Sequence, residues 1–190
     1  MIDTYVSIDI ETTGIDPENC QILEIGAVID NCKDAIEDCP TFHGYVDNGT
    51  LVGEPYALSM HPIILRRIAV KERGFDYLRP EYVVDHFLQF LRENNLKPER
   101  SKISVAGKNY AGFDARFLSK IDGWDGYINT DHRVIDPGMM YWDHKIDGMV
   151  LPDMKTCMKR AGIDGDVAHT AVEDARVVCM LIRRKLGIML

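Results

Sequence analysis

The sequence predicts an α/β fold in which a mixed five-stranded sheet is flanked by helices. Three segments in the first quarter of the chain have strand character and short connections, which is typical of an antiparallel meander. Helical and strand segments then alternate, and this order favours a mixed sheet covered by helices. The 190 residues contain no Pro/Gly/Ser-rich linker and no internal repeat, so we expect a single domain over residues 1–190.

The first strand is predicted where apolar and polar residues alternate with a period of two, in the order Tyr5-Val6-Ser7-Ile8-Asp9-Ile10-Glu11. One face of this strand is apolar, and Asp9 and Glu11 project together from the other face. Two adjacent carboxylates repel each other unless something offsets the repulsion, and a shared divalent cation is the usual answer. The alternative is an edge strand with a solvated acidic face.

The remaining strands are expected over Gln21–Asp30, Thr41–Asp47, Lys102–Ala106 and His132–Asp136. Asp16-Pro17-Glu18-Asn19 is a turn signal between the first two strands. Helices are expected over Pro80–Asn95, Phe113–Ile121, Pro152–Ala161 and Thr170–Leu186, from apolar residues at helical spacing.

The composition narrows the class of protein. No run of about 18 apolar residues is present and no secretory signal is visible, so we expect neither a membrane span nor export. The five cysteines are scattered, which favours reduced thiols in the cytoplasm and argues against a zinc site. The net charge of −8 argues against a protein that coats nucleic acid electrostatically. It does not exclude a nuclease, because bound metal ions bring positive charge to an acidic site.

A second acidic position, Asp114, follows the segment Gly107–Phe113. Asp114 shares a predicted helical face with Phe117, Leu118 and Ile121, at spacings of three, four and seven. A carboxylate on an apolar face is costly unless it is paired or binds a metal. The alternative is an aspartate favoured by the helix dipole, worth under about 1 kcal/mol, and for Asp114 alone that alternative is stronger.

A third segment combines a histidine with an acid. Thr170 and Glu173 have the spacing of a capping box, which predicts a helix that begins at Thr170. His169 would then lie in the loop before the helix, and Asp174 would point inward from its first turns. A surface loop histidine is the alternative for His169.

Taken together, the three segments indicate two-metal hydrolysis of a phosphodiester. Four carboxylates suit two cations about 4 Å apart, which stabilise the attacking and leaving oxygens. A histidine of near-neutral pKa suits the proton transfer from the attacking water. The residues concerned are Asp9, Glu11, Asp114, Asp174 and His169.

From Tyr5 to about Leu186, the chain resembles the DEDDh exonucleases, the DnaQ-like 3′→5′ exonucleases of the ribonuclease-H-like fold. The resemblance is carried by three motifs in the family's order: Asp9-x-Glu11-Thr12-Thr13-Gly14, Asn109 to Asp114, and His169-x-Ala171-x-x-Asp174. It implies a metal-dependent enzyme that removes nucleoside 5′-monophosphates from single-stranded 3′ ends of DNA or RNA.

The resemblance also implies roles for the motif residues. Asp9, Glu11 and Asp174 would bind the first Mg²⁺ (or Mn²⁺), with Asp9 bridging to a second. Asp114 would act on the second ion, partly through water, and His169 would be the general base. The implied substrate contacts are Thr12, Thr13, Met60, His61 and Asn109. A buried methionine and a surface histidine are equally good interpretations of Met60 and His61.

Two departures from the family's motifs leave the choice between DNA and RNA open. Three residues separate Asn109 from Phe113, which is closer to the oligoribonucleases, and Arg133 to Asp136 is also similar to them. Phe113 itself replaces their glutamine and is similar to the proofreading and ribonuclease T branches. The competing interpretations are an oligoribonuclease-like enzyme on short RNAs, a polymerase-associated proofreading subunit and an inactive scaffold. The intact motif residues argue against the scaffold, and a homodimer is left open.

Overall fold

The computed structural model describes residues 4–165 and 170–189. The strands are β1 (Tyr5–Thr12), β2 (Ile22–Asp30), β3 (Thr41–Val46), β4 (Tyr77–Leu78) and β5 (Val105–Ala106). The α-helices are α1 (Pro55–Met60), α2 (Pro62–Val70), α3 (Val83–Glu93), α4 (Asp114–Leu118), α5 (Trp124–Tyr127), α6 (Pro137–Met140), α7 (His144–Asp147), α8 (Met154–Ala161) and α9 (Ala171–Leu186). Two 3₁₀ turns, η1 and η2, cover Ile36–Asp38 and Pro80–Tyr82.

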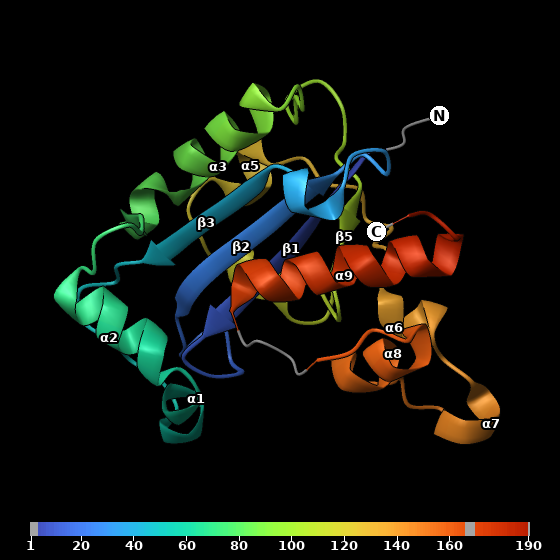
Figure 1. Cartoon of the computed structure of the whole chain (residues 1–190). Coiled ribbons are helices and arrows are strands. Elements are labelled where there is room, and N and C mark those ends of the chain that lie inside the picture. The colour runs from blue at the N-terminus through green and yellow to red at the C-terminus, as the bar shows by residue number, and fades with distance from the viewer. Residues whose placement is uncertain (1–3, 166–169, 190) are drawn as a thin grey trace.

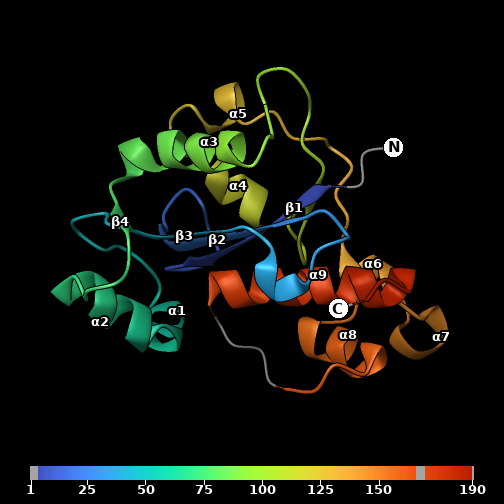
Figure 2. The same ribbon diagram turned by 45° about the horizontal axis from the view of Figure 1, so that its top comes forward.

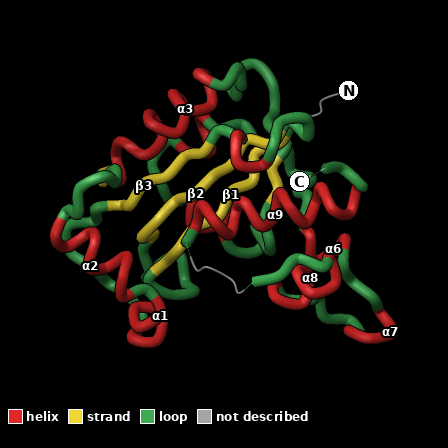
Figure 3. The backbone as a smooth tube through the Cα atoms, in the orientation of Figure 1, coloured by secondary structure: helices red, strands yellow, loops and turns green. Residues whose placement is uncertain are grey.

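The five strands form one mixed sheet in the order β4-β3-β2-β1-β5. The β1–β2 and β2–β3 pairs are antiparallel, whereas β5 pairs with β1, and β4 with β3, in parallel. The long strands β1, β2 and β3 run side by side through the centre (Figure 3). The structure thus confirms the predicted class, a mixed five-stranded sheet flanked by helices.

Helices cover both faces of the sheet (Figures 1 and 2). On one face, α3 buries Val84, Phe87 and Leu91 in a cluster that also contains the apolar side chains of β1. On the other face, α9 crosses β1 and β2, and α8 and α6 pack against α9. No helix within the described ranges combines the length and the apolar character needed to cross a membrane.

One strand prediction needs correction, and one strand was not predicted. His132–Asp136 does not form a strand, since only Ile135 makes a bridge, to Ala106 at the end of β5. The fifth strand is instead β4, at the opposite edge of the sheet. A strand of two residues is too short to show a period in the sequence. The helices α1 and α2 were also not predicted.

Strand β1 is an interior strand, which excludes the interpretation of a solvated edge. It lies between β2 and β5, and its non-core face is covered by α9, so that Ser7 is fully buried. Ile8 and Ile10 belong to the core cluster on the α3 side, as the alternation predicted.

Gly26 of β2 allows α9 to approach the sheet closely. Gly26 is paired with Asp9 in the β1–β2 register. A Cβ atom at Gly26 would lie 2.2 Å from the carbonyl carbon of Ala171 and 2.3 Å from the nitrogen of Val172. The first turn of α9 therefore rests on the backbone of β2, directly beside Asp9.

Candidate metal-dependent active site

Three carboxylates from distant parts of the chain converge at the C-terminal end of β1. Asp9 and Glu11 project from β1, and Asp174 projects from the first turn of α9. One carboxylate oxygen from each lies within 4.8 Å of the others. Glu11 and Asp174 are 163 positions apart in the sequence, and the packing of α9 on β1 and β2 brings them together.

Burial and mutual repulsion disfavour the charged forms of Asp9 and Glu11. Burial raises the pKa of Glu11 to about 8, helped by the charges of Asp174, Glu24 and Asp114. Burial also raises the pKa of Asp9 well above its usual range, and the negative charges of Asp114, Glu11 and Asp174 raise it further. A cluster of oxygen ligands whose own repulsion is this strong fits a hard divalent cation, which would offset the repulsion.

Asp114 stands next to the three clustered acids. It is buried at the first position of α4, and its Oδ1 accepts a hydrogen bond from the Ile10 N–H of β1 at 3.1 Å. Burial raises its pKa to about 7, against the lowering effect of backbone hydrogen bonds, and its charge is the second largest cause of the shift in Asp9. The structure thus brings all four predicted carboxylates to one end of β1.

These shifts predict the pH dependence of the metal-free protein. A group with a raised pKa in the folded state stabilises the fold at low pH, and this contribution is lost as the pH rises through the folded pKa. We therefore expect the Tm in EDTA to fall by several degrees between pH 5 and pH 8.5, since each kcal/mol shifts Tm by roughly 2–4 °C at this size. Thermal denaturation followed by circular dichroism measures it. Glu11→Gln should make the fall of Tm with pH less steep. An equal fall in that variant would contradict the assignment of this pH dependence to Glu11.

His169, the predicted general base, lies outside the described residues. Thr170 does occupy the N-cap position of α9, as predicted, but its side chain makes no capping hydrogen bond. The capping-box prediction is therefore wrong in its contacts. Glu173 is exposed and pairs with Arg176.

The N-terminus of α9 is capped by a residue that the sequence analysis missed. The Ala171 N–H donates to Oε2 of Glu24 at 3.2 Å. Glu24 is 1% exposed, and β2 places it opposite Glu11 in the strand register. The available signal was a carboxylate inside an apolar run of β2, which is buried along its whole length and has its only other acid, Asp30, at its end.

Thr12 and Thr13 are both buried where β1 ends. The Thr12 hydroxyl donates to the Gly14 carbonyl at 2.7 Å. Thr13 is fully buried, and its hydroxyl donates to the Val52 carbonyl and accepts from the Gln21 N–H. The backbone N–H and carbonyl of Thr13 are also bonded to other loop residues. Thr13 thus joins the loops around the site, and a substrate contact by either threonine stays a prediction.

Met60 and His61 lie beside the acids, at the junction of α1 and α2. His61 Nε2 is 3.5 Å from Oε2 of Glu11, whereas Met60 is 43% exposed. They border a cavity of about 330 Å³ that reaches Thr170 at the start of α9. The cavity is lined by Met60, His61, Pro62, Ile63, Ile64, Arg67 and Thr170. The buried-methionine interpretation of Met60 is therefore wrong, and the histidine is the more enclosed of the two.

Asn109 lies in the loop that leads to Asp114. Its backbone is left-handed (φ 61°), and its N–H donates to the Asp136 carboxylate at 3.0 Å. Asp136 also accepts from the Gly138 N–H and so caps α6. Asp136 therefore fixes the loop that carries Asn109.

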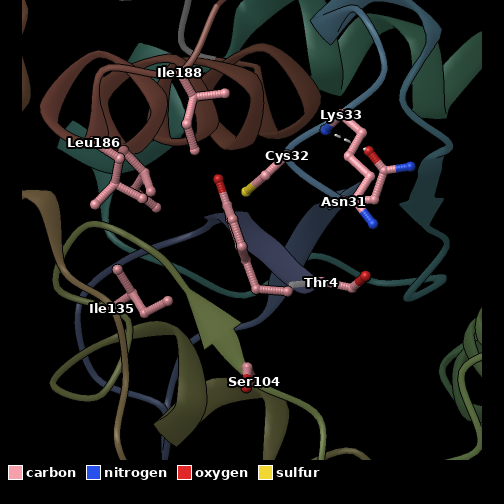
Figure 4. A pocket seen from close by; sticks show the side chains of 10 residues that line it. Thr4, Asn31, Cys32, Lys33, Ser104, Ile135, Leu186 and Ile188 are labelled. Atoms are coloured by element: carbon pink, nitrogen blue, oxygen red, sulfur yellow. Dashed lines mark hydrogen bonds between the residues drawn. The ribbon is translucent and has the colours of Figure 1, made fainter. Parts of the chain in front are cut away.

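A second cavity, of about 380 Å³, lies near the other end of α9 (Figure 4). Ile135, Leu186 and Ile188 supply much of its apolar wall, and Cys32 and Lys33 face it from the loop after β2. No acidic residue lines it among the described residues. The chemistry of the carboxylate cluster, rather than the presence of an apolar cavity, identifies the candidate active site.

The chain is similar to known exonucleases in sequence and in fold. The profile of the exonuclease family (RNase_T) matches residues 6–182. The PolC-type DNA polymerase III of Clostridium perfringens (strain 13 / Type A) is 27% identical over 191 residues, which cover 95% of this chain and 11% of that protein. The chain thus spans about a tenth of that curated relative.

Solved structures of exonucleases share the fold. E. coli exonuclease I in complex with a dT13 oligonucleotide has a TM-score of 0.64 at 17% identity, over 97% of this chain and 40% of that one. A full-length 3′-exonuclease has a TM-score of 0.65 at 18% identity, over 98% and 82%. Together with the three motifs and the carboxylate cluster, the profile match shows that this chain belongs to the exonuclease family, in its DEDDh (DnaQ-like) group.

Proposed function

We propose that this chain is a metal-dependent 3′→5′ exonuclease that releases nucleoside 5′-monophosphates from single-stranded 3′ ends. The observation that carries the proposal is the convergence of Asp9, Glu11 and Asp174 within 4.8 Å, with Asp114 beside them. The donors are carboxylate oxygens, as Mg²⁺ and Mn²⁺ prefer. The family membership supports the reaction class, and the complex of exonuclease I with dT13 supports single-stranded DNA as a substrate.

In this mechanism Asp9, Glu11 and Asp174 would hold one divalent cation, and Asp9 and Asp114 would hold a second. The chemistry that such ions would supply is activation of the attacking water and stabilisation of the charge on the transferred phosphate. His61 and Met60 flank the terminal nucleotide in the cavity beside Glu11, and Asn109 approaches it from the loop before Asp114. His169 takes the proton from the attacking water.

The test uses matched 5′-labelled DNA and RNA oligonucleotides with single-stranded 3′ ends, and a dinucleotide. We expect stepwise shortening from the 3′ end with Mg²⁺ or Mn²⁺, release of 5′-monophosphates, and slower reaction on a 3′-phosphate. EDTA should abolish hydrolysis. Full activity in EDTA, or shortening from the 5′ end, would contradict the proposal.

The dinucleotide also tests the second candidate, an oligoribonuclease-like enzyme on short RNAs. That candidate is favoured by the three residues between Asn109 and Phe113. A strong preference for RNA dinucleotides over the longer DNA and RNA substrates would replace the broad exonuclease by this enzyme.

The location, the partners and the oligomeric state of the protein belong to the same proposal. The five cysteines are scattered along the sequence without a Cys-x-x-Cys pair, which fits a reducing cytoplasmic location. A proofreading role beside a polymerase is the alternative suggested by the PolC-type relative. The mass of the protein in solution tests whether it forms a homodimer.

His169→Asn is expected to lower kcat by about 10²-fold or more, because asparagine cannot take the proton from the attacking water. In the wild-type protein kcat should rise with pH through roughly 6 to 7.5, as the imidazole becomes neutral. Affinity for Mn²⁺ should persist, since the carboxylates are unchanged. Wild-type kcat and an unchanged pH profile in His169→Asn would show that another group takes the proton.

A further inference from the structure

Both carboxylate oxygens of the buried Glu24 side chain make a hydrogen bond. These bonds connect β2, which carries Glu24, to β3 and to α9. Oε1 lies 2.6 Å from His43 Nε2 on β3, and Oε2 accepts from the Ala171 N–H at the start of α9. The side chain is 2% exposed, whereas that of His43 is 26% exposed. A carboxylate is costly to bury, and here these two partners compensate for its burial.

The hydrogen bond to Ala171 replaces an ordinary helix cap. The first N–H groups of a helix have no partner within the helix, and a threonine at the N-cap usually accepts from one of them. Thr170 stands at that position without making such a bond, and Glu24 accepts from across the sheet instead. The start of α9 is thereby tied to β2 rather than only to its own preceding loop.

The position of this hydrogen bond matters because Asp174 is in the same helical turn. The Asp174 N–H donates to the Thr170 carbonyl, so the segment Thr170–Asp174 forms one turn. Gly26 lets this turn rest on the backbone of β2, two residues from Glu24. In the strand register Glu24 lies opposite Glu11, and Gly26 opposite Asp9. β2, which carries Glu24, is therefore paired with β1, which carries Asp9 and Glu11.

The carboxylate of Glu24 lies close to the clustered acids, because Glu24 is paired with Glu11 in the strand register. Its negative charge adds to those that already repel one another in Asp9 and Glu11. A neutral cap from Thr170 would satisfy the helix without this repulsion. The charge of Glu24 is therefore a cost, and the role that we infer rests on the hydrogen bonds it makes rather than on that charge.

We propose that Glu24, held by His43, is a positioning residue that fixes the first turn of α9 on β2 and thereby sets the place of Asp174 relative to Asp9 and Glu11. This inference rests on the proposed exonuclease function. Outer-shell hydrogen bonds of this kind change metal affinity or activity by about 10–100-fold when they are removed.

The experiment compares Glu24→Ala with Glu24→Gln. Glu24→Ala removes the acceptor, and we expect the Mn²⁺ dissociation constant of the metal-free protein, measured by calorimetry, to rise by about 10-fold or more. At saturating oligonucleotide kcat should fall by a similar factor, with KM within about twofold. Glu24→Gln keeps an acceptor for Ala171 and a partner for His43, and should stay within a few-fold of the wild-type protein.

Glu173→Ala is the matched control, because it removes an exposed carboxylate from the same helical turn and should leave the Mn²⁺ affinity unchanged. Wild-type Mn²⁺ affinity and kcat in Glu24→Ala would overturn the positioning role, as would a defect in Glu24→Gln equal to that of Glu24→Ala. If Glu24→Ala does not fold, His43→Ala serves instead: weaker Mn²⁺ binding supports the role, and wild-type binding overturns it. If the wild-type protein were inactive but Glu24→Ala still bound Mn²⁺ less tightly than the wild-type protein, only the exonuclease function would be refuted. The positioning role of Glu24 would stand.

Discussion

Asp9→Asn is expected to lower kcat by about 10³-fold or more at saturating Mg²⁺, while raising the Tm of the metal-free protein. Asp9 is one of the three clustered carboxylates, and it is the residue that we propose would hold both ions. The electrostatic contribution of catalytic metals is several kcal/mol, and each 1.36 kcal/mol is tenfold in rate. The amide also removes a charge that burial and the charges of Asp114 and Glu11 disfavour.

The matched control is Asp85→Asn, which makes the same chemical change at an exposed position of α3 on the other face of the sheet. It should leave kcat unchanged and should not raise the metal-free Tm, since Asp85 lies in the first turn of α3, where the helix dipole favours its charge. The measurements are hydrolysis of a single-stranded oligonucleotide and thermal denaturation in EDTA. If Asp9→Asn kept kcat within tenfold of the wild-type value, Asp9 would not be a metal ligand. If its metal-free Tm fell, the repulsion inferred for the cluster would be wrong.

The long elements could be predicted because their side chains repeat with a clear period. The alternation around Ile8 and Ile10 correctly identified the buried face of β1, and the start of α9 was placed at Thr170. The two-residue strand β4 carries no such period, and the segment His132–Asp136 has the composition of a strand without the pairing. Short pairings of this kind depend on tertiary contacts that a local pattern does not record.

The acids of the candidate site could be predicted because each stands in a pattern that makes it unusual. Their convergence could not be derived from periodicity, since it depends on how closely α9 approaches β2 at Gly26. Glu24 was missed because its partners, His43 and Ala171, lie 19 and 147 residues away in the sequence. A sequence pattern shows which residues are polar, but it does not show which polar groups pair.

Arg183 was missed for the same reason, and its partners are at the other end of α9. Its guanidinium makes two hydrogen bonds to Asp30, through Nε at 3.0 Å and Nη2 at 2.7 Å. The two side chains are 1% and 0% exposed. Burial alone would raise the pKa of Asp30, but hydrogen bonds from Arg183, Tyr5 and the Cys32 N–H lower it. Arg183 also donates to the backbone carbonyls of Asp34 and Met189.

Arg183→Met is therefore expected to lower the free energy of unfolding by about 3–5 kcal/mol, the usual cost of leaving a buried charge without its partner. Urea denaturation followed by circular dichroism measures it. Arg184→Met, at the adjacent exposed position, is the control and should stay within about 0.5 kcal/mol of the wild-type protein.

The double variant Asp30→Asn/Arg183→Met should be more stable than Arg183→Met, because the buried charge is then gone. Asparagine still accepts from the Cys32 N–H through its amide oxygen, and its NH₂ group can donate to the Tyr5 hydroxyl oxygen. Folded Arg183→Met should keep the wild-type Mn²⁺ affinity, since nine residues of helix separate position 183 from Asp174, about 13 Å along the axis. A single variant within 1 kcal/mol of the wild-type protein, or a double variant less stable than Arg183→Met, would show that the ion pair does not stabilise the fold. Weakened Mn²⁺ binding would instead show that this end of α9 is coupled to the carboxylate cluster, so the two measurements separate the stabilising role of Arg183 from the catalytic role proposed for the opposite end of the helix.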